Sequence, residues 1–271
     1  MITKKKLVST LIVTYNAKDY ILSTINSCLN QTYSNFEILI LDNASTDDTI
    51  NIINNIKDSR IKLYKSATNT GPYLGLNFLL NKAKGEYIAI QDHDDLWLPQ
   101  KLEKQINYLN LNKNRIALGS RAFIFYESKQ VLISDNKPSE LNYVNHTSLM
   151  FRNNGYRYDL KYLLTDEHFE KITLGGNTTK IHCLKDILSI HRIRGDRHNL
   201  SRTRFKFNQK NISQYFEING LSITTFINLF GIFVAKYFPP SIEWFIIDKI
   251  VKRNSEKITL SEFRKKYPNI F

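Results

Sequence analysis

Residues 85–99 read GEYIAIQDHDDLWLP, and this stretch decides the fold. An apolar strand runs directly into three carboxylates, Asp92, Asp94 and Asp95, and a helix start follows at Pro99. One aspartate is enough to cap that helix, but three within four residues repel one another unless cations or protons offset their charge. Open α/β sheets bind ligands at the carboxyl ends of their strands, and hard oxygen donors there suit Mg²⁺ or Mn²⁺ shared with a diphosphate. The stretch therefore predicts a cation site, with a purely capping turn as the alternative.

The residues on the amino-terminal side of this stretch alternate strands with helices. Apolar runs at 7–13, 36–41, 61–64 and 86–91 predict strands, with helices beginning at Asp19 and at a capping Ser45 and spanning 73–83. Polar groups follow three of these strands, at 14–16, 42–43 and 92–95. The alternation predicts an α/β fold with a mainly parallel sheet flanked by helices, in which these polar groups meet in one pocket.

Composition limits the class of protein. The 271 residues are 42% hydrophobic and 12% aromatic, which is typical of a globular chain with one large domain or two small ones. Cys28 and Cys183 both lie in apolar segments, so we expect buried thiols and a cytoplasmic protein. The apolar run after Lys6 is too short for a signal peptide and is expected to form the first strand.

The formal net charge of +13 admits three kinds of partner: nucleic acid, an anionic membrane surface, or anionic small substrates. Lysines and arginines concentrate after residue 190, whereas the amino-terminal half is nearly balanced. Solvated helix faces account for many charge runs, so the charge alone does not choose among these partners. Three carboxylates at a strand end would repel phosphate groups, which argues against a nucleic-acid-binding module.

Four motifs occur in one order, at 8–16, 27–33, 36–49 and 85–99. Together they resemble the signatures of family 2 glycosyltransferases of the bacterial surface-glycan type, which are inverting enzymes with the GT-A fold. The resemblance implies a nucleotide-sugar-binding half over 1–112 and an acceptor-binding half over 113–200. It also implies a nucleoside-diphosphate sugar donor, a UDP-hexose or UDP-N-acetylhexosamine, and a glycan or lipid-linked saccharide acceptor in polysaccharide biosynthesis.

The resemblance assigns roles by motif position. Base and ribose contacts fall on Thr14, Tyr15, Asn16 and Asp42. The D-x-D pair that holds Mg²⁺ or Mn²⁺ falls on Asp92 and Asp94, with Asp95 as a neighbouring candidate and His93 as a bystander. Candidates for clamping the diphosphate are Arg192, Arg194, Arg197 and His198, because guanidinium groups suit phosphate oxygens.

A general base must accept the proton of the acceptor hydroxyl. Family 2 enzymes usually carry an E-D pair at the start of a short helix, and the resemblance places Asp166 at the base position with Thr165 in place of the glutamate. Two alternatives stay open: Asp166 is only a helix cap, or Glu167 is the base because the register shifts by one residue.

Beyond residue 200 the resemblance ends, and we expect a basic, apolar helical extension over 201–271. The segment 221–238 is strongly apolar but marginal for a membrane span, and 241–253 is amphipathic. Such a segment either packs on its own protein or binds peripherally to the inner face of the plasma membrane.

A sugar-phosphate nucleotidyltransferase is the alternative enzyme class, because it has a similar sheet. It requires a glycine-rich loop after the first strand, and residues 14–20 contain no glycine. The sequence therefore favours a metal-dependent glycosyltransferase.

Overall fold

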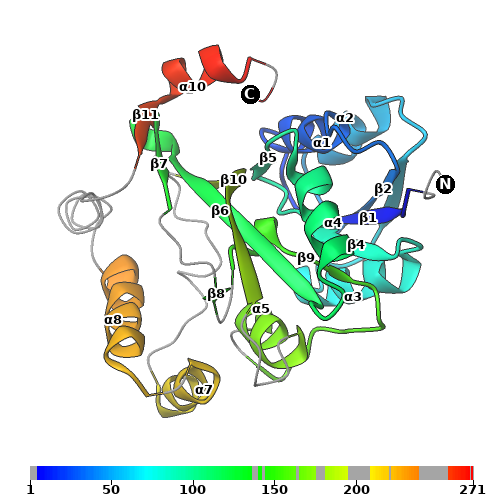
Figure 1. Cartoon of the computed structure of the whole chain (residues 1–271). Helices are drawn as coiled ribbons and strands as arrows, with labels where there is room; N and C mark the ends of the chain where they lie inside the picture. The colour runs from blue at the N-terminus through cyan, green and yellow to red at the C-terminus, as the bar shows by residue number, and fades with distance from the viewer. Residues whose placement is uncertain are drawn as a thin grey trace.

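The computed structural model describes residues 5–135, 140–141, 144–162, 165–174, 181–194, 208–219, 221–237, 256–268 and 270. One mixed sheet forms the centre of the molecule, with the strand order β11-β7-β6-β9-β4-β1-β2-β3, and β10 pairs with β5, β6 and β8 (Figure 1). Its strands are β1 (Val8–Thr14), β2 (Phe36–Asp42), β3 (Ile61–Lys65), β4 (Tyr87–Ile90), β5 (Leu96–Trp97), β6 (Ala117–Tyr126), β7 (Val131–Ser134), β8 (Glu140–Leu141), β9 (Met150–Arg152), β10 (Ile181–Ile193) and β11 (Lys257–Thr259). The α/β class predicted from the sequence is confirmed.

Strands β1 to β4 are the parallel part of the sheet. β1 pairs in parallel with both β2 and β4, and Thr14 lies opposite Asp42 in the β1–β2 register. The chain moves outward from β1 through β2 to β3 and then returns to the other side of β1 for β4, so a topological switch point lies between β1 and β4. Ligands of open α/β sheets bind at such a point.

Helices cover both faces of the parallel part. They are α1 (Ile21–Leu29), α2 (Thr49–Asn55), α3 (Pro72–Lys82) and α4 (Lys101–Leu111). Alternate residues of β1 face opposite sides: Ile12 packs in a cluster with residues of α1, α2 and α4, whereas Leu11 packs with residues of α3. Strand β2 is buried along its whole length, as expected for a strand covered on two faces.

The helix expected to be capped by Ser45 begins four residues later, at Thr49. Asp47 Oδ1 accepts hydrogen bonds from the backbone N–H (3.0 Å) and the hydroxyl (2.5 Å) of Thr49. Ser45 Oγ instead accepts from the backbone N–H of Asn16 at 2.9 Å. Ser45 therefore joins the loops after β1 and β2, which is a contact between distant residues that local capping rules do not predict.

The second half adds antiparallel strands and short helices to the sheet. These helices are η1 (Glu127–Lys129), η2 (His146–Ser148), α5 (Thr165–His168), the π-helical turn η3 (Phe169–Leu174), α7 (Gln209–Asn219), α8 (Ile223–Tyr237) and α10 (Leu260–Lys266). β10 runs parallel to β6, with register shifts between Leu184 and Ser189.

The end of the chain returns to the sheet. β11 pairs antiparallel with β7, and Phe263 of α10 packs edge-on against Phe123 at 5.7 Å between ring centroids. The extension expected over 201–271 thus contains an edge strand as well as helices. None of the helices in the described part of the chain has the length and apolar character needed to cross a bilayer.

Candidate active site

The acidic turn, residues 91–95, joins β4 to β5 at the switch point. Thr24 Oγ1 of α1 lies 2.9 Å from the carbonyl oxygens of both His93 and Asp95. The Gln91 side-chain amide donates to the carbonyl of Asp95 at 2.6 Å. These contacts fix the backbone of the turn and thereby the positions from which its carboxylate side chains start.

Asp95 is fully buried and binds the end of β10. Its Oδ1 accepts from the backbone N–H of Arg192 at 2.8 Å, and its Oδ2 lies 3.0 Å from Nδ1 of His191. Burial raises the pKa of Asp95 to about 6, although His191 opposes that shift. Burial lowers the pKa of His191, but the charge and hydrogen bond of Asp95 outweigh it and raise the value to about 9. At neutral pH the buried Asp95 and the partly exposed His191 form an ion pair that connects the turn to β10.

Asp92 is the carboxylate of the turn that is most open to solvent, with 40% of its side chain exposed. Its Oδ1 lies 3.3 Å from Nδ1 of His146, and Nε2 of that histidine lies 2.9 Å from the Tyr158 hydroxyl. Desolvation raises the pKa of Asp92, but the hydrogen bond and charge of His146 dominate and lower it. Burial lowers the pKa of His146, whereas Asp92, Asp166 and Glu170 raise it to about 9. A charged histidine therefore contacts Asp92, and the carboxylates of α5 and η3 act on that histidine.

Asp94 pairs with Arg194, whose Nε lies 3.1 Å from Oδ2 of the carboxylate. Arg192 lies deeper: its Nε donates to the Asp94 carbonyl at 2.9 Å and its Nη1 to Glu127 at 2.7 Å. Its guanidinium also lies over the ring of Tyr20, 5.0 Å from the centroid. Arg192 thus holds the turn in place, whereas Arg194 lies at the carboxylate itself.

Positively charged side chains of the protein lie beside all three carboxylates of the acidic turn. The repulsion among the three carboxylates is offset by histidines and arginines of the protein itself, so repulsion alone does not require a metal ion. The described residues contain no group of three or more histidine, cysteine, aspartate or glutamate side chains arranged to hold one. Asp92 and Asp94 still fit a hard cation, because Mg²⁺ is usually held by one or two carboxylates together with substrate phosphates.

The predicted base and ribose contacts lie across the switch point. Asp42 is buried, and its Oδ2 accepts from the backbone N–H of Ser45 at 3.0 Å. Its Oδ1 and the Thr14 hydroxyl are buried without a hydrogen-bond partner among the described residues. Unsatisfied buried oxygens are rare in native proteins and suit a site that a ligand completes.

Tyr15 and Asn16 complete this loop. The Tyr15 side chain is 42% exposed, and Asn16 adopts a left-handed backbone conformation with φ 47°. The Asn16 side-chain carbonyl accepts from the backbone N–H of Thr46 at 2.8 Å. Asn16 is therefore fixed by the neighbouring loop, while Tyr15 presents an aromatic face to solvent.

Asp166 is half-buried on α5, and its charge acts on His146 and Tyr158. The charge of Glu167 acts instead on Tyr215 of α7 and on Lys171. Asp166 is thus on the side of the acidic turn, and Glu167 is on the side of α7. Arg197 and His198 lie outside the described residues, so their predicted contacts stay predictions.

Sequence reasoning assigned no role to His146, His191 and Tyr158. A titratable residue beside a predicted strand is a weak signal, because the sequence does not say which strand end lies next to it.

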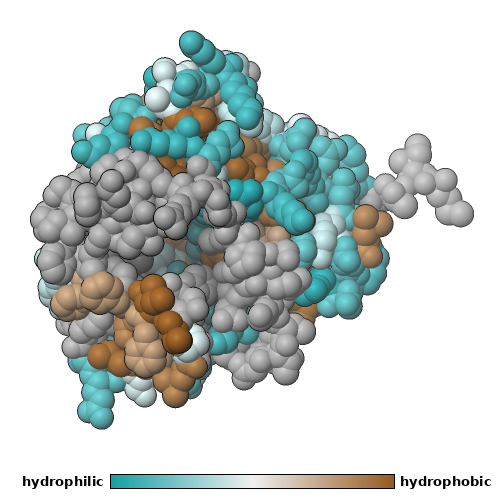
Figure 2. Space-filling model, turned by 60° about the vertical axis from the view of Figure 1, so that its left-hand side comes forward, coloured by the Kyte–Doolittle hydropathy of each residue, from teal (hydrophilic) through white to brown (hydrophobic). Residues whose placement is uncertain are grey.

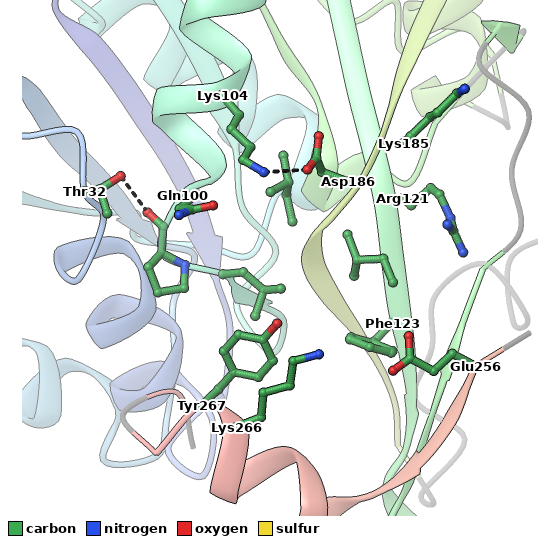
Figure 3. A pocket seen from close by; sticks show the side chains of 14 residues that line it. Thr32, Gln100, Lys104, Arg121, Phe123, Lys185, Asp186, Glu256, Lys266 and Tyr267 are labelled. Carbon is green, nitrogen blue, oxygen red and sulfur yellow. Dashed lines mark hydrogen bonds and ion pairs between the residues drawn. The ribbon is translucent and has the colours of Figure 1, made fainter.

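A separate groove lies beyond the acidic turn, between the start of α4, the middle of β10 and α10 (Figure 3). Its volume is about 570 Å³, and the Lys104–Asp186 ion pair spans one side. Lys185, Lys266 and Tyr267 also line it. None of the predicted site residues that the structure describes lines this groove.

Comparisons with known proteins place the chain in a family. The family model for glycosyl transferase family 2 matches residues 9–171. An Escherichia coli relative, UDP-Glc:alpha-D-GlcNAc-diphosphoundecaprenol beta-1,3-glucosyltransferase WfaP, is 42% identical over 140 residues, which are 51% of this chain and 54% of the relative. The chain thus spans about half the length of the first curated relatives that it matches.

Solved structures show the same fold. Staphylococcus aureus TarS 1–349 in complex with UDP-GlcNAc has a TM-score of 0.65 at 17% identity, covering 91% of this chain and 77% of that one. The mannosyltransferase PcManGT from Pyrobaculum calidifontis, in complex with GDP-Man and Mn²⁺, has a TM-score of 0.61 at 16% identity, covering 87% and 70%. The matched family model covers more than half of the sequence and includes the acidic turn and α5. The chain therefore belongs to family 2 of the glycosyl transferases.

Proposed function

We propose that the protein is an inverting glycosyltransferase of cell-surface polysaccharide biosynthesis. It transfers a hexose or N-acetylhexosamine from a UDP-sugar to a hydroxyl of a glycan or lipid-linked acceptor. One observation carries this proposal: the acidic turn follows β4, which pairs with β1, unsatisfied buried oxygens lie at the ends of β1 and β2, and Asp92 of the turn contacts His146, on which the charge of Asp166 acts. That arrangement suits a nucleotide on one side and an acceptor on the other.

The β1 and β2 loops would bind the nucleoside. Tyr15 offers a stacking surface for the base, and Asp42 Oδ1 offers an acceptor for a base N–H or ribose hydroxyl. Asp92 and Asp94 would hold Mg²⁺ or Mn²⁺, which would neutralise the charge of the leaving diphosphate. A neighbour in structure was solved with Mn²⁺, which supports such an ion here. Arg194 adds a positive charge at the same place.

Asp166 would act on the acceptor. The acceptor oxygen attacks the anomeric carbon, the bond from that carbon to the diphosphate breaks, and the proton of the hydroxyl moves to the Asp166 carboxylate. The nucleoside diphosphate leaves with the electron pair, and the configuration at the anomeric carbon inverts. The charge of this carboxylate acts on His146, whose own positive charge and hydrogen bond lower the pKa of Asp92.

The name of the Escherichia coli relative describes a glucosyl transfer to a saccharide on a diphosphoundecaprenol. This supports a lipid-linked acceptor for the present protein. Both cysteines are buried and form no disulfide, in agreement with the cytoplasmic location that we propose for it.

The experiment is a donor screen that measures release of nucleoside diphosphate with Mg²⁺, Mn²⁺ or a chelator. We expect turnover of a UDP-sugar that stops on chelation. Asp94→Ala should reduce it by about 10²-fold or more, since it removes a ligand of the ion that would neutralise the leaving diphosphate. Leu111→Ala, far from the turn on exposed surface, is the matched control. Full activity of Asp94→Ala, with an unchanged circular dichroism spectrum, would contradict the assignment.

A further inference from the structure

One face of α8 is apolar and exposed to solvent. Among the described residues thirteen large hydrophobic side chains are exposed, and seven of them belong to 221–237. Ile223 is 81% exposed, Ile227 63% and Phe230 64%. Figure 2 shows the resulting apolar patch over α8. Single exposed hydrophobic residues need no explanation, but a contiguous patch marks an interaction site.

The spacing shows that this is a continuous stripe. Its exposed members after Ile223 follow at intervals of three and four residues along the helix: Phe226, Ile227, Phe230, Phe233 and Tyr237. In a globular protein such a stripe faces the core. Here the protein contacts another side of α8 and one edge of the stripe: the carbonyl of buried Thr225 accepts a hydrogen bond from the Tyr215 hydroxyl of α7 at 3.5 Å, and Phe226 lies 4.8 Å from Phe216 of α7 between ring centroids.

The length of α8 and the charge of the surrounding segment indicate which kind of partner binds its exposed face. A helix of 15 residues is about 22 Å long, which is shorter than the hydrocarbon core of a bilayer of about 30 Å. Residues 221–235 contain no charged side chain, yet the segment 201–271 holds twelve lysines and arginines against five aspartates and glutamates. An apolar stripe within a basic segment is typical of helices that lie in the interface of an anionic membrane. A second copy of this chain would bring the same positive charge and be repelled.

We propose that α8 lies in the surface of an anionic lipid bilayer, with its exposed stripe at the boundary between headgroups and acyl chains. The basic residues of the same segment bind the anionic headgroups. Each contribution alone gives weak binding, and the two together give a reversible peripheral attachment.

The position of α8 also relates the membrane to the active site, an argument that rests on the proposed function. The charge of Glu167 of α5 acts on buried Tyr215 of α7, and the charge of Glu217 of α7 acts on His168 of α5. The hairpin of α7 and α8 is therefore next to α5, on the acceptor side. A saccharide attached to a membrane lipid would approach Asp166 from the bilayer to which α8 binds.

The test is flotation of the 271-residue protein with vesicles of phosphatidylglycerol and phosphatidylethanolamine, compared with phosphatidylcholine vesicles. We expect the protein to float with the anionic vesicles and to be released by high salt. The triple variant Ile223→Gln/Ile227→Gln/Phe230→Gln should bind the anionic vesicles at least about tenfold more weakly than the wild type, because three apolar side chains no longer enter the bilayer. The matched control is Leu22→Gln/Leu111→Gln, which removes two exposed apolar side chains from other surfaces.

Calorimetric affinity for UDP should be the same in all three proteins, which would show that the variants are folded. Flotation of the triple variant at the wild-type level would overturn the proposal, as would absence of wild-type flotation. So would a wild-type dimer in analytical ultracentrifugation that the triple variant lacks, because the stripe would then be a contact between copies. Flotation without any sugar transfer would leave the membrane site standing and remove the proposed function.

Discussion

Asp94 and Asp95 are adjacent in sequence but have different surroundings. Asp95 is enclosed between β5 and β10, where His191 and the backbone of Arg192 occupy both of its oxygens. Asp94 pairs with Arg194 at the edge of the turn. The sequence predicts the acidic turn because its residues are contiguous. It does not predict the partners, because His146 and His191 are 54 and 96 residues away from the aspartates that they contact.

For Asp42, we expect Asp42→Ala to weaken UDP binding by about 1–3 kcal/mol, the effect of leaving a ligand donor unpaired in a buried site. Isothermal titration calorimetry measures this directly. A substitution of the neighbouring Asn43 is the matched control, because the Asn43 side chain holds the loop at 69–71 through hydrogen bonds to Asn69 and Gly71. Equal affinity of wild type and Asp42→Ala would remove Asp42 from the nucleotide site.

For Asp166, we expect Asp166→Asn to slow sugar transfer by about 10²-fold or more, because a proton acceptor is lost while the size of the side chain is kept. Donor affinity should not change. Glu167→Gln is the control, since Glu167 lies on the side of α7. A defect in Glu167→Gln instead of Asp166→Asn would show that the base is one residue further along, and activity in both would exclude this helix as its source.

Lys101, the first residue of α4, has a fully buried side chain. Its Nζ donates to the Gln105 side chain at 2.9 Å and lies 4.0 Å from the centroid of the Trp97 ring. Burial lowers its pKa from 10.5 to about 7, with a smaller opposing effect of Cys28. Since the folded pKa lies below the unfolded one, this lysine destabilises the fold increasingly as the pH falls from about 10.5 to about 7, and by a constant amount below that.

We therefore expect Lys101→Met to raise the free energy of unfolding by about 1–4 kcal/mol at pH 7 and by much less at pH 10. Urea unfolding at the two pH values measures the difference. Lys104→Met, one turn further along and partly exposed, should show no such pH dependence. A loss of stability in Lys101→Met at pH 7 would mean that the amide and ring contacts outweigh the burial of the charge.

At the scale of elements, the junction before β4 is held by a buried polar network. Glu37 Oε1 of β2 accepts from the Ser9 hydroxyl (2.7 Å) and the backbone N–H of Lys84 (3.0 Å), and Oε2 pairs with Lys62 at 2.6 Å. Ser9 Oγ in turn accepts from the backbone N–H of Gly85 at 2.8 Å. Gly85 has no alternative here, because a Cβ would lie 2.5 Å from the backbone nitrogen of Ser9. The network fixes the position at which β4 starts and therefore the position of the acidic turn that follows β4.

Burial raises the pKa of Glu37, but its hydrogen bonds from Lys62, Lys84 and Ser9 outweigh this and lower the pKa below 4.5. The ionised side chain therefore stabilises the fold above pH 4.5, and that contribution is lost as the pH falls through the folded pKa. We expect Glu37→Gln to lower the free energy of unfolding by about 1–3 kcal/mol at pH 7 and by less near pH 3. Glu86→Gln, whose ion pair with Lys6 is exposed, is the control. A Glu37→Gln effect of equal size at both pH values would show that charge is not involved.

The elements differ in how far the sequence predicts them. From β1 to α4 the apolar periodicity is local, and the predicted boundaries agree with the structure within a few residues, except at Ser45. β7 and β11 were not predicted. They are short, and their pairing joins residues 131–133 with 257–259, a contact that no local pattern contains.

At the scale of the whole molecule, the three hydrophobic clusters have different origins. Two lie on opposite faces of the parallel strands and follow from the alternation of their residues. The third, which includes Phe123, Leu132 and Phe263, requires α10 to return from the end of the chain. Neither composition nor resemblance predicts that return, because it depends on tertiary contacts alone.

The return of β11 to β7 makes the α7–α8 hairpin an insertion with two fixed ends. A protein shortened after residue 207 would lose an edge strand and Phe263 together with the hairpin, so its inactivity would not report on α8. The informative chimera exchanges residues 208–255 for the corresponding segment of a relative and keeps 256–271. Because both ends of the hairpin are attached to the sheet, its sequence can change in evolution without a change in the transferase fold.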